Sequence, residues 1–154
     1  MVTIADVEKA QQAWGEGIVA IATAHRSGMD YVERARHHIK SLYAYDIGTV
    51  LFKPTFAIKE QFRSTFEGAL SYFVADNGVC PEDNGFAIKN WTNVRFENKD
   101  IVINGTTAMA MGNYFFTTSE GEEVKVEFSF GYIVDSSGDL RIHLHHSSMP
   151  ASID

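Results

Sequence analysis

The sequence predicts an α+β fold in which N-terminal helices pack on one face of a curved antiparallel sheet. In the first half of the chain, up to about residue 76, apolar residues recur at spacings of three and four, which is typical of amphipathic helices. From Phe86 onward they alternate with a period of two, and short stretches of turn-forming residues separate the alternating segments. Helices followed by a run of strands are typical of α+β folds. The length of 154 residues predicts one domain, residues 1–154.

Two helices are predicted first. One begins near Thr3 and ends near Gly28, and Asp30 can cap a second helix over residues 31–44. The apolar face of the first helix is Val7, Ala10, Trp14, Ile18 and Ile21, and that of the second is Val32, Ala35, Ile39 and Leu42. Such one-sided helices need a partner surface.

A short strand and a third helix follow. The strand is predicted over residues 48–52, because Pro54 cannot continue it. The helix is predicted over residues 56–76, where the apolar positions Ile58, Phe62, Phe66, Ala69 and Phe73 again recur at helical spacing.

The sequence from Phe86 onward predicts a meander of antiparallel strands. The turn formers "NKD", "NG", "SEGEE" and "SSGD" separate its segments. The strands are expected over residues 86–97, 100–103, 106–118, 124–135 and 140–148.

Charge and composition restrict the partners. The net charge of −7 repels phosphate backbones and anionic lipids, so we expect no nucleic acid and no membrane as partner. No apolar run approaches the roughly 20 residues of a membrane helix, and the N-terminus lacks the pattern of an export signal. The single cysteine, Cys80, excludes an internal disulfide. We expect a small or neutral ligand and a cytoplasmic location.

The last strand, "RIHLHHSSMP", carries three of the six histidines and invites a metal-site interpretation. His143 and His145 are two positions apart and would share a face, and His25, His37 or His38 could supply a third ligand. However, the sequence has no HExxH and no paired-cysteine motif, so the pattern alone does not establish a metal.

A serine nucleophile is a second interpretation of this strand. Ser147 or Ser148 would need an adjacent base, yet neighbours on a strand point to opposite faces, so His146 cannot serve Ser147. The GxSxG motif is also absent, which disfavours a conventional triad.

The third interpretation is a polar cluster that positions water or a small molecule. Alternation divides the strand into two sets. One is Ile142, Leu144, His146 and Ser148, and the other is Arg141, His143, His145 and Ser147. Ile142 favours the first set as the core face near that residue. A bulge near the doubled histidines, or a sheet buried on both sides by dimerisation, would reverse or blur the assignment, so the sequence alone does not choose the face.

Two further hydroxyls could join such a pocket. Thr55 follows Pro54 at the corner between strand and helix, and Tyr72 lies among phenylalanines. Each hydroxyl needs a hydrogen-bond partner when buried, either in the backbone or in a shared pocket of apolar walls and a few polar groups.

Five stretches together resemble the association-domain branch of the nuclear transport factor two-like, or SnoaL-like, superfamily. They are "YAYDIGTVLFKPTFA", "FEGALSYFV", "MGNYFFT", "VEFSFGYI" and "LRIHLHHSSMP". The resemblance covers nearly the whole chain. It implies a cone-shaped fold with a strongly bent sheet around a long helix, usually paired as a homodimer through the outer face of the sheet.

Within that superfamily, the ending "HHSS" most resembles the iota-class carbonic anhydrases of algae and bacteria. The resemblance implies reversible hydration of carbon dioxide to bicarbonate without a metal or other cofactor. The implied catalytic residues are Thr55 of "KPT", Tyr72 of "SYF", and His145 with Ser147 from the closing motif. In the alternative register, His146 and Ser148 would contact the substrate.

Two other functions remain open at this level. Kinase association domains share the implied fold and serve oligomerisation, so the histidines could lie in a subunit interface. An isomerase or hydrolase would need an acid or base in the pocket, for which Asp46 is the candidate.

Overall fold

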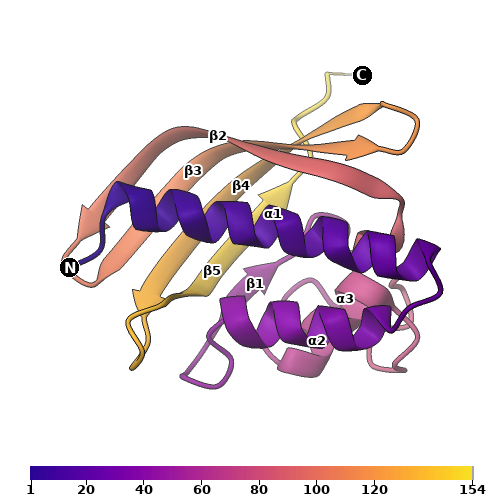
Figure 1. Cartoon of the computed structure of the whole chain (residues 1–154), viewed down its shortest axis with the longest axis horizontal. Coiled ribbons are helices and arrows are strands. Elements are labelled where there is room, and N and C mark those ends of the chain that lie inside the picture. Colours follow the sequence, from indigo (N-terminus) through magenta and orange to yellow (C-terminus); the bar gives the residue numbers. More distant parts are fainter. Residues whose placement is uncertain (154) are drawn as a thin grey trace.

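The computed structural model describes residues 1–153. Helices cover one face of a five-stranded curved sheet, as predicted (Figure 1). The elements are α1 (Ile4–Arg26), α2 (Tyr31–Leu42), β1 (Leu51–Lys53), α3 (Phe66–Val74), the short 3₁₀ helix η1 (Phe86–Ile88), β2 (Trp91–Asn104), β3 (Thr107–Thr118), β4 (Glu123–Val134) and β5 (Leu140–Ser148). The strand order is β1-β5-β4-β3-β2.

Helices α1 and α2 confirm the sequence prediction, including the cap that Asp30 makes on α2, although Val32 of the predicted apolar face is exposed. Thr3 accepts a hydrogen bond from the Asp6 backbone N–H, and the Asp6 carboxylate accepts one from the Thr3 N–H, which completes a capping box. Asp30 caps α2 by accepting from the Glu33 N–H. Long helix α1 lies across the concave face of the sheet, with α2 beside it (Figure 1).

The predicted third helix is too long by about ten residues. Residues 56–65 form a loop in which Ile58 and Phe62 are 77% and 72% exposed, and the helix begins only after Thr65, which caps it. The carboxylate of Glu82 accepts hydrogen bonds from three consecutive backbone N–H groups of this loop, those of residues 58–60. Because Glu82 is more than 20 residues away in sequence, helical periodicity could not reveal this alternative.

The strands form a sheet with two features that the sequence prediction did not contain. Residues 86–97 and 100–103 were expected as two strands, but most of them form one strand, β2, with a bulge near Lys99. Gly112 lies opposite this bulge, and a Cβ there would come within 2.1 Å of the Glu97 carbonyl oxygen. The bulge bends the sheet, and only glycine permits the close approach of the two strands.

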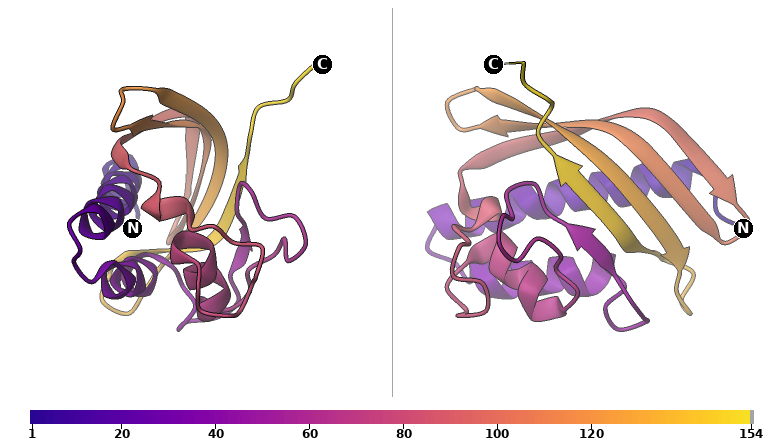
Figure 2. Two further views of the ribbon diagram at one scale, coloured as in Figure 1. Left: turned by 90° about the vertical axis from the view of Figure 1, so that its right-hand side faces the viewer. Right: turned by 180° about the vertical axis from the view of Figure 1, so that it is seen from behind.

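Strand β1 pairs in parallel with β5, so the sheet is mixed although its four long strands are antiparallel. The two views in Figure 2 show β1 beside β5 at one edge of the sheet. This pairing places Phe52 next to His145 and directs the following residues, including Thr55, toward the end of β5. The edge strand therefore positions part of the candidate site.

The core lies between the helices and the concave face of the sheet and is rich in aromatic rings. The largest fully buried side chains include Trp14, Tyr43, Tyr114, Tyr132, Phe52, Phe73, Phe116, Phe128 and Phe130.

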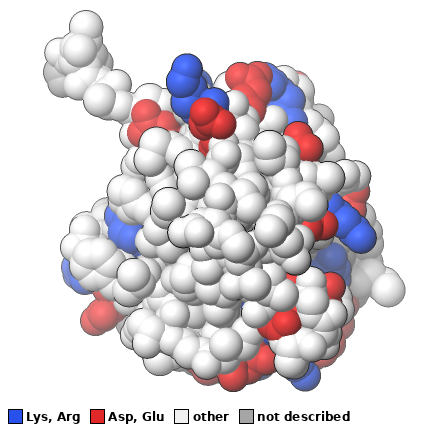
Figure 3. Space-filling model, turned by 90° about the vertical axis from the view of Figure 1, so that its left-hand side faces the viewer, with Lys and Arg blue, Asp and Glu red and all other residues white. Residues whose placement is uncertain are grey.

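On the outside, Figure 3 shows one side of the molecule with a broad central area free of charged side chains and a charged rim. Among the described residues, no helix is long and apolar enough to span a membrane.

Candidate functional site

A bulge in β5 decides which histidine and serine reach the core. Tyr132 pairs with Ile142 and Gly131 pairs with Leu144, so His143 is an extra residue between two regular pairs. A Cβ on Gly131 would meet both Leu144 and His143, which shows that these two side chains lie on the same side. After the bulge, His145 and Ser147 are buried at 2% and 1% exposure.

Ile142 lies on the core face as the sequence favoured, and the bulge that the sequence left open reverses the assignment beyond it, so that His145 and Ser147 face the core. His146 is exposed, and Ser148 donates a hydrogen bond to Glu127 on the neighbouring strand, away from the core. The reason is physical: one extra residue in a strand exchanges the inward and outward positions beyond it.

His145 lies at the centre of a buried hydrogen-bond chain. Its Nδ1 is 2.8 Å from the hydroxyl of Tyr43, and its Nε2 is 3.0 Å from the hydroxyl of Tyr114. The imidazole is stacked between Phe52 and Phe130, at centroid distances of 4.8 and 4.1 Å. The two hydroxyls and the two rings together fix the plane and the rotation of the imidazole.

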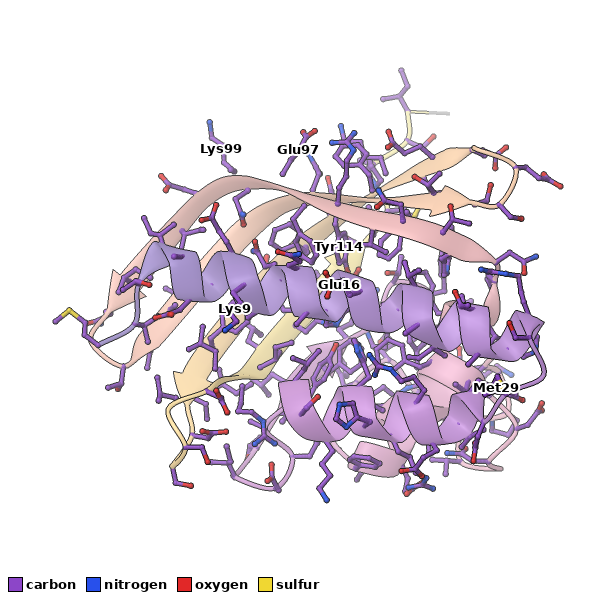
Figure 4. All side chains as sticks on the ribbon, viewed as in Figure 1. Lys9, Glu16, Met29, Glu97, Lys99 and Tyr114 are labelled. Atoms are coloured by element: carbon purple, nitrogen blue, oxygen red, sulfur yellow. The ribbon has the colours of Figure 1, made fainter. Side chains whose placement is uncertain are left out.

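The series of hydrogen bonds continues on both sides of His145. Trp14 Nε1 donates to the Tyr43 hydroxyl over 3.0 Å. On the other side, the Tyr114 hydroxyl is hydrogen-bonded to Ser147 Oγ, which in turn lies 2.6 Å from Thr55 Oγ1. The Tyr114 side chain is buried, and Figure 4 shows it in the space between α1 and β2.

The proton positions along this chain follow from its first donor. Because Tyr43 accepts from Trp14, which can only donate, the Tyr43 proton points to Nδ1 of His145. Nδ1 is then the acceptor of a neutral imidazole, and Nε2–H donates to Tyr114. The opposite tautomer would leave the buried Tyr43 proton without an acceptor among residues 1–153, at a cost of roughly 1–3 kcal/mol.

The hydroxyls beyond His145 donate in the same direction, as far as the last member of the hydrogen-bond series, Thr55. Tyr114 donates to Ser147, Ser147 donates to Thr55, and the Thr55 proton remains for a further acceptor. The chain therefore presents a hydroxyl donor at its Thr55 end.

Burial sets the charge state of these groups. Burial lowers the pKa of His145 well below its usual 6.5, and the neighbouring His146 and His38 lower it further. Burial also raises the pKa of Tyr43 and Tyr114 above the usual 10. At neutral pH the imidazole is therefore uncharged and the phenols keep their protons. The series of hydrogen bonds thus consists of neutral N–H and O–H donors, without a charged group.

Tyr72 joins the site from α3. Its hydroxyl accepts a hydrogen bond from the Phe56 backbone N–H at 3.3 Å and also interacts with the Thr55 hydroxyl. Burial raises the pKa of Tyr72 to about 12, so this group is also a donor at neutral pH.

These side chains enclose a small cavity. Its polar wall is Thr55, Tyr72, Tyr114, His145 and Ser147, and its apolar wall is Trp14, Phe52, Pro54, Phe73 and Phe86. The volume is about 10 Å³, which is the space of one water molecule. Hydroxyl donors on one side and aromatic rings on the other can hold a water beside a small apolar molecule.

The structure thus brings together four of the sequence-predicted site residues, Thr55, Tyr72, His145 and Ser147. It does not bring His146 and Ser148 to the cavity. Asp46 is also elsewhere, where it forms an ion pair with Arg141 and is 63% exposed at its side chain.

The sequence analysis did not identify Tyr43, Tyr114 and Trp14 as members of the hydrogen-bond series. Tyr114 could have been found, because it shares the inward face of its strand with Ala108 and Ala110, and a buried tyrosine hydroxyl needs a partner. Tyr43 and Trp14 carry no such signal, since the contact between them depends on how α1 and α2 pack.

The histidines of β5 do not assemble with others into a metal-ligand cluster. Both ring nitrogens of His145 are hydrogen-bonded to tyrosines, and the bulge separates His143 from it. Over residues 1–153, no group of three or more His, Cys, Asp or Glu side chains has the arrangement needed to hold a metal ion.

Comparison with known proteins gives the family. A sequence model of the family described as "Metal-independent carbonic anhydrase" matches residues 5–149. The chain is 43% identical over 152 residues to the metal-independent carbonic anhydrase of Nostoc sp. (strain PCC 7120), covering 97% of this chain and 74% of that protein.

Solved structures agree with the sequence comparison. A crystal structure of a cyanobacterial iota-carbonic anhydrase complexed with bicarbonate matches with a TM-score of 0.96 and 42% identity, covering 98% of this chain and 94% of the other. A member of the nuclear transport factor two-like family from Streptomyces avermitilis matches with a TM-score of 0.60 and 16% identity, covering 97% and 96% of the two chains, and this likeness shows the shared fold alone.

Proposed function

The chain belongs to the family of metal-independent carbonic anhydrases, and we propose that its aromatic cavity is the site of reversible hydration of carbon dioxide to bicarbonate. The observation that carries this proposal is the polarised chain of hydroxyls that ends at the cavity. The match to a relative of the same class in complex with bicarbonate supports it.

The cavity supplies what the reaction needs from a protein. Phe52, Phe73 and Phe86 offer an apolar wall for carbon dioxide, and the hydroxyls of Thr55 and Ser147 hold a water beside it. Because the space is that of one water, the side chains that line it must move apart when carbon dioxide enters.

The chemical step forms one C–O bond, moves the π pair of one C=O bond to its oxygen and breaks one O–H bond of the water. The water oxygen attacks the carbon, the pair of one C=O bond moves to its oxygen, and the water releases a proton that must reach solvent. The negative charge develops on the former carbon dioxide oxygens, where the protons of Tyr72 and Thr55 can stabilise it. Fixed donors of this kind act most strongly where water is excluded.

His145 serves as a positioning residue in this mechanism. Its pKa lies well below neutral pH, so it does not remove a proton from water as a general base would. Instead, its Nε2–H fixes the direction of the Tyr114 hydroxyl, which in turn orients Ser147. Because both ring nitrogens are hydrogen-bonded to tyrosine hydroxyls, we infer that His145 holds the network in place and does not relay the proton.

The test is stopped-flow measurement of carbon dioxide hydration on purified protein before and after exhaustive chelation, with metal content measured on the same sample. Activity retained in metal-free protein is the expected result, because the proposal assigns the chemistry to hydroxyl donors. Activity that disappears with the metal and returns with it would refute the hydroxyl mechanism.

We also propose that the protein is a homodimer that pairs through the outer face of the sheet. Strand pairing places Val102, Met109, Gly131, Leu144 and Leu51 in one row across the whole sheet. Val102, Met109 and Leu51 are more than half exposed, and Met111, on the same face as Met109, is 61% exposed. Contiguous exposed apolar side chains of this kind are typical of subunit interfaces.

Light scattering coupled to size exclusion tests the dimer. The wild-type protein should have twice the mass of the chain, and Met109→Glu should have the mass of one chain. The matched control is Ile58→Glu, since Ile58 is equally apolar and exposed but lies on the loop before α3. A wild-type monomer would contradict the proposal.

The cytoplasmic location remains a prediction that cell fractionation can check.

A further inference from the structure

A buried ion pair between Arg63 and Asp83 contacts the helix that carries Tyr72. The two side chains are 1% and 3% exposed. Nη1 and Nη2 of Arg63 donate to the two carboxylate oxygens of Asp83 at 2.7 and 2.8 Å, which is the bidentate geometry of strong arginine–carboxylate pairs. Neither residue lines the cavity. The pair therefore lies outside the groups that contact carbon dioxide.

The other donors of Arg63 hold two neighbouring segments. Nε donates to the carbonyl of Glu60 at 2.7 Å, in the loop after Thr55, and Nη1 also donates to the carbonyl of Gly68 at 2.9 Å, in α3. The backbone N–H of Arg63 donates to the carbonyl of Phe52 in β1 at 2.7 Å. Arg63 thus ties β1 and the loop that follows it to α3.

Asp83 makes the matching connection from the segment after α3. Its carboxylate accepts a hydrogen bond from the Ser71 hydroxyl at 2.6 Å, and Ser71 directly precedes Tyr72. The guanidinium carbon of Arg63 lies over the Tyr72 ring, 5.7 Å from its centroid. The ion pair therefore contacts Tyr72 in two ways, through the preceding residue and through the ring itself.

The position of the Tyr72 hydroxyl depends on these contacts. Helix α3 has only nine residues, too few to be stable without tertiary packing. The Tyr72 ring also stacks on Phe86, at a centroid distance of 5.7 Å and an angle of 15°. Its hydroxyl accepts from the N–H of Phe56, which belongs to the loop that Arg63 holds. The ring and the hydroxyl are thus fixed by segments that meet at the ion pair.

Position, rather than net charge, is what this pair contributes. Burial is the main reason why the pKa of Tyr72 is raised, and the charges of Asp83 and Arg63 shift it in opposite directions. Two well-packed apolar side chains of similar volume are often as stabilising as a buried ion pair. They lack, however, the rigid fork of a guanidinium, which holds several acceptors at defined angles.

We propose that Arg63 and Asp83 are positioning residues for carbon dioxide hydration, which hold the Tyr72 hydroxyl where it donates to the forming bicarbonate. This role rests on the proposed function, because Tyr72 meets bicarbonate only if the cavity is the active site. Neither residue of the pair touches the substrate, and both act through Tyr72.

Replacing the whole pair by apolar side chains tests this role. In Arg63→Met combined with Asp83→Leu, neither charge is left alone in the interior, so the fold can be retained while the fork is lost. Stopped flow gives kcat and KM, and urea denaturation gives stability. Nuclear magnetic resonance of protein labelled with ¹³C at tyrosine Cζ reports the hydrogen bonding of the Tyr72 hydroxyl, with Tyr72→Phe to assign the signal.

The expected result is a folded double variant whose kcat is about 10²-fold lower, the usual effect of a misplaced group near the reacting atoms. KM should change much less, because the lost interaction is made in the transition state. The Cζ signal of Tyr72 should shift or broaden. The matched control is Asp135→Asn, since Asp135 pairs with another buried arginine, Arg141, and it should keep both kcat and the Tyr72 signal.

A conservative variant keeps the test decisive if the double variant does not fold. Arg63→Lys retains the positive charge but cannot serve Asp83, Glu60 and Gly68 at once. We expect it to fold and to lose about tenfold in kcat, again with a shifted Tyr72 signal.

Two results would overturn the positioning role in an active wild-type background. One is wild-type kcat in a folded variant that lacks the fork, which would make the pair structural only. The other is a lower kcat with an unchanged Tyr72 signal, which would show that the pair does not act through Tyr72. A wild-type protein without hydration activity is a different failure, because it would refute the catalytic proposal itself and with it any role of the pair in hydration.

Discussion

The hydroxyl of Tyr43, at the end of α2, lies 2.8 Å from Nδ1 of His145, which is 102 positions later in the chain. This contact joins the helical layer to the last strand of the sheet at the centre of the core. Since Tyr43 also accepts from Trp14, the contact decides which nitrogen of His145 carries the proton. Helix packing thereby determines the direction of the hydroxyls at the cavity lined by Thr55, Tyr72 and Ser147.

Changing Ser147 to alanine should interrupt the chain between Tyr114 and Thr55. We expect kcat to fall by about 10²–10³-fold, the usual effect of losing one preorganised donor, while the fold is retained. Stopped-flow hydration and circular dichroism measure the two properties. Ser148→Ala is the matched control, because Ser148 donates to Glu127 outside the core and its loss should leave kcat unchanged. Equal activity of both variants with wild type would remove Ser147 from the mechanism.

Changing Tyr72 to phenylalanine should remove a donor from the cavity and the acceptor of the Phe56 N–H. We expect kcat to fall by about 10²-fold, together with a modest loss of stability of about 1 kcal/mol. Stopped flow and urea denaturation give the two values. In Tyr31→Phe, an equivalent change on α2 away from the cavity, both should stay near wild type. A stability loss in Tyr72→Phe without any change in kcat would assign Tyr72 a structural role only.

Changing Tyr43 to phenylalanine should free Nδ1 of His145 from its donor. The imidazole would then populate both tautomers, because the other nitrogen still faces a hydroxyl that can donate or accept. The ¹⁵N shifts of His145 report the tautomer directly, and kcat should fall with the loss of orientation. The control Tyr45→Phe removes a hydroxyl that donates to the Arg63 carbonyl, so it should affect stability but not the tautomer. An unchanged His145 spectrum in Tyr43→Phe would show that Tyr43 does not set the proton position.

Stability should fall as the pH is lowered below about 6.5. His145 and His38 have folded-state pKa values below that of the unfolded chain, since burial disfavours their charged forms. The unfolded state therefore binds more protons, and the free energy of unfolding decreases by about 1.4 kcal/mol per pH unit for each histidine as the pH falls below 6.5. Urea denaturation at a series of pH values measures this slope. A slope near zero between neutral pH and pH 5 would contradict the neutral burial of both histidines.

Much of the architecture follows from local rules that the sequence displays. The helical spacing of Val7, Trp14 and Ile21 and the capping residues Thr3 and Asp30 suffice to place α1 and α2. The resemblance of "KPT", "SYF" and "HHSS" to a known family was enough to predict Thr55, Tyr72, His145 and Ser147 as site residues, and the four line one cavity. These properties depend on residue type and spacing, which a sequence contains in full.

Only the tertiary structure decided which face of β5 lines the cavity and how its protons are arranged. The bulge at His143 depends on the partner Gly131 in β4, and the tautomer of His145 depends on Trp14 in α1. The short third helix likewise depends on Glu82, which binds the loop before it. Each of these outcomes is a contact between residues far apart in the chain, and the free energy of such a contact exists only once the elements have packed.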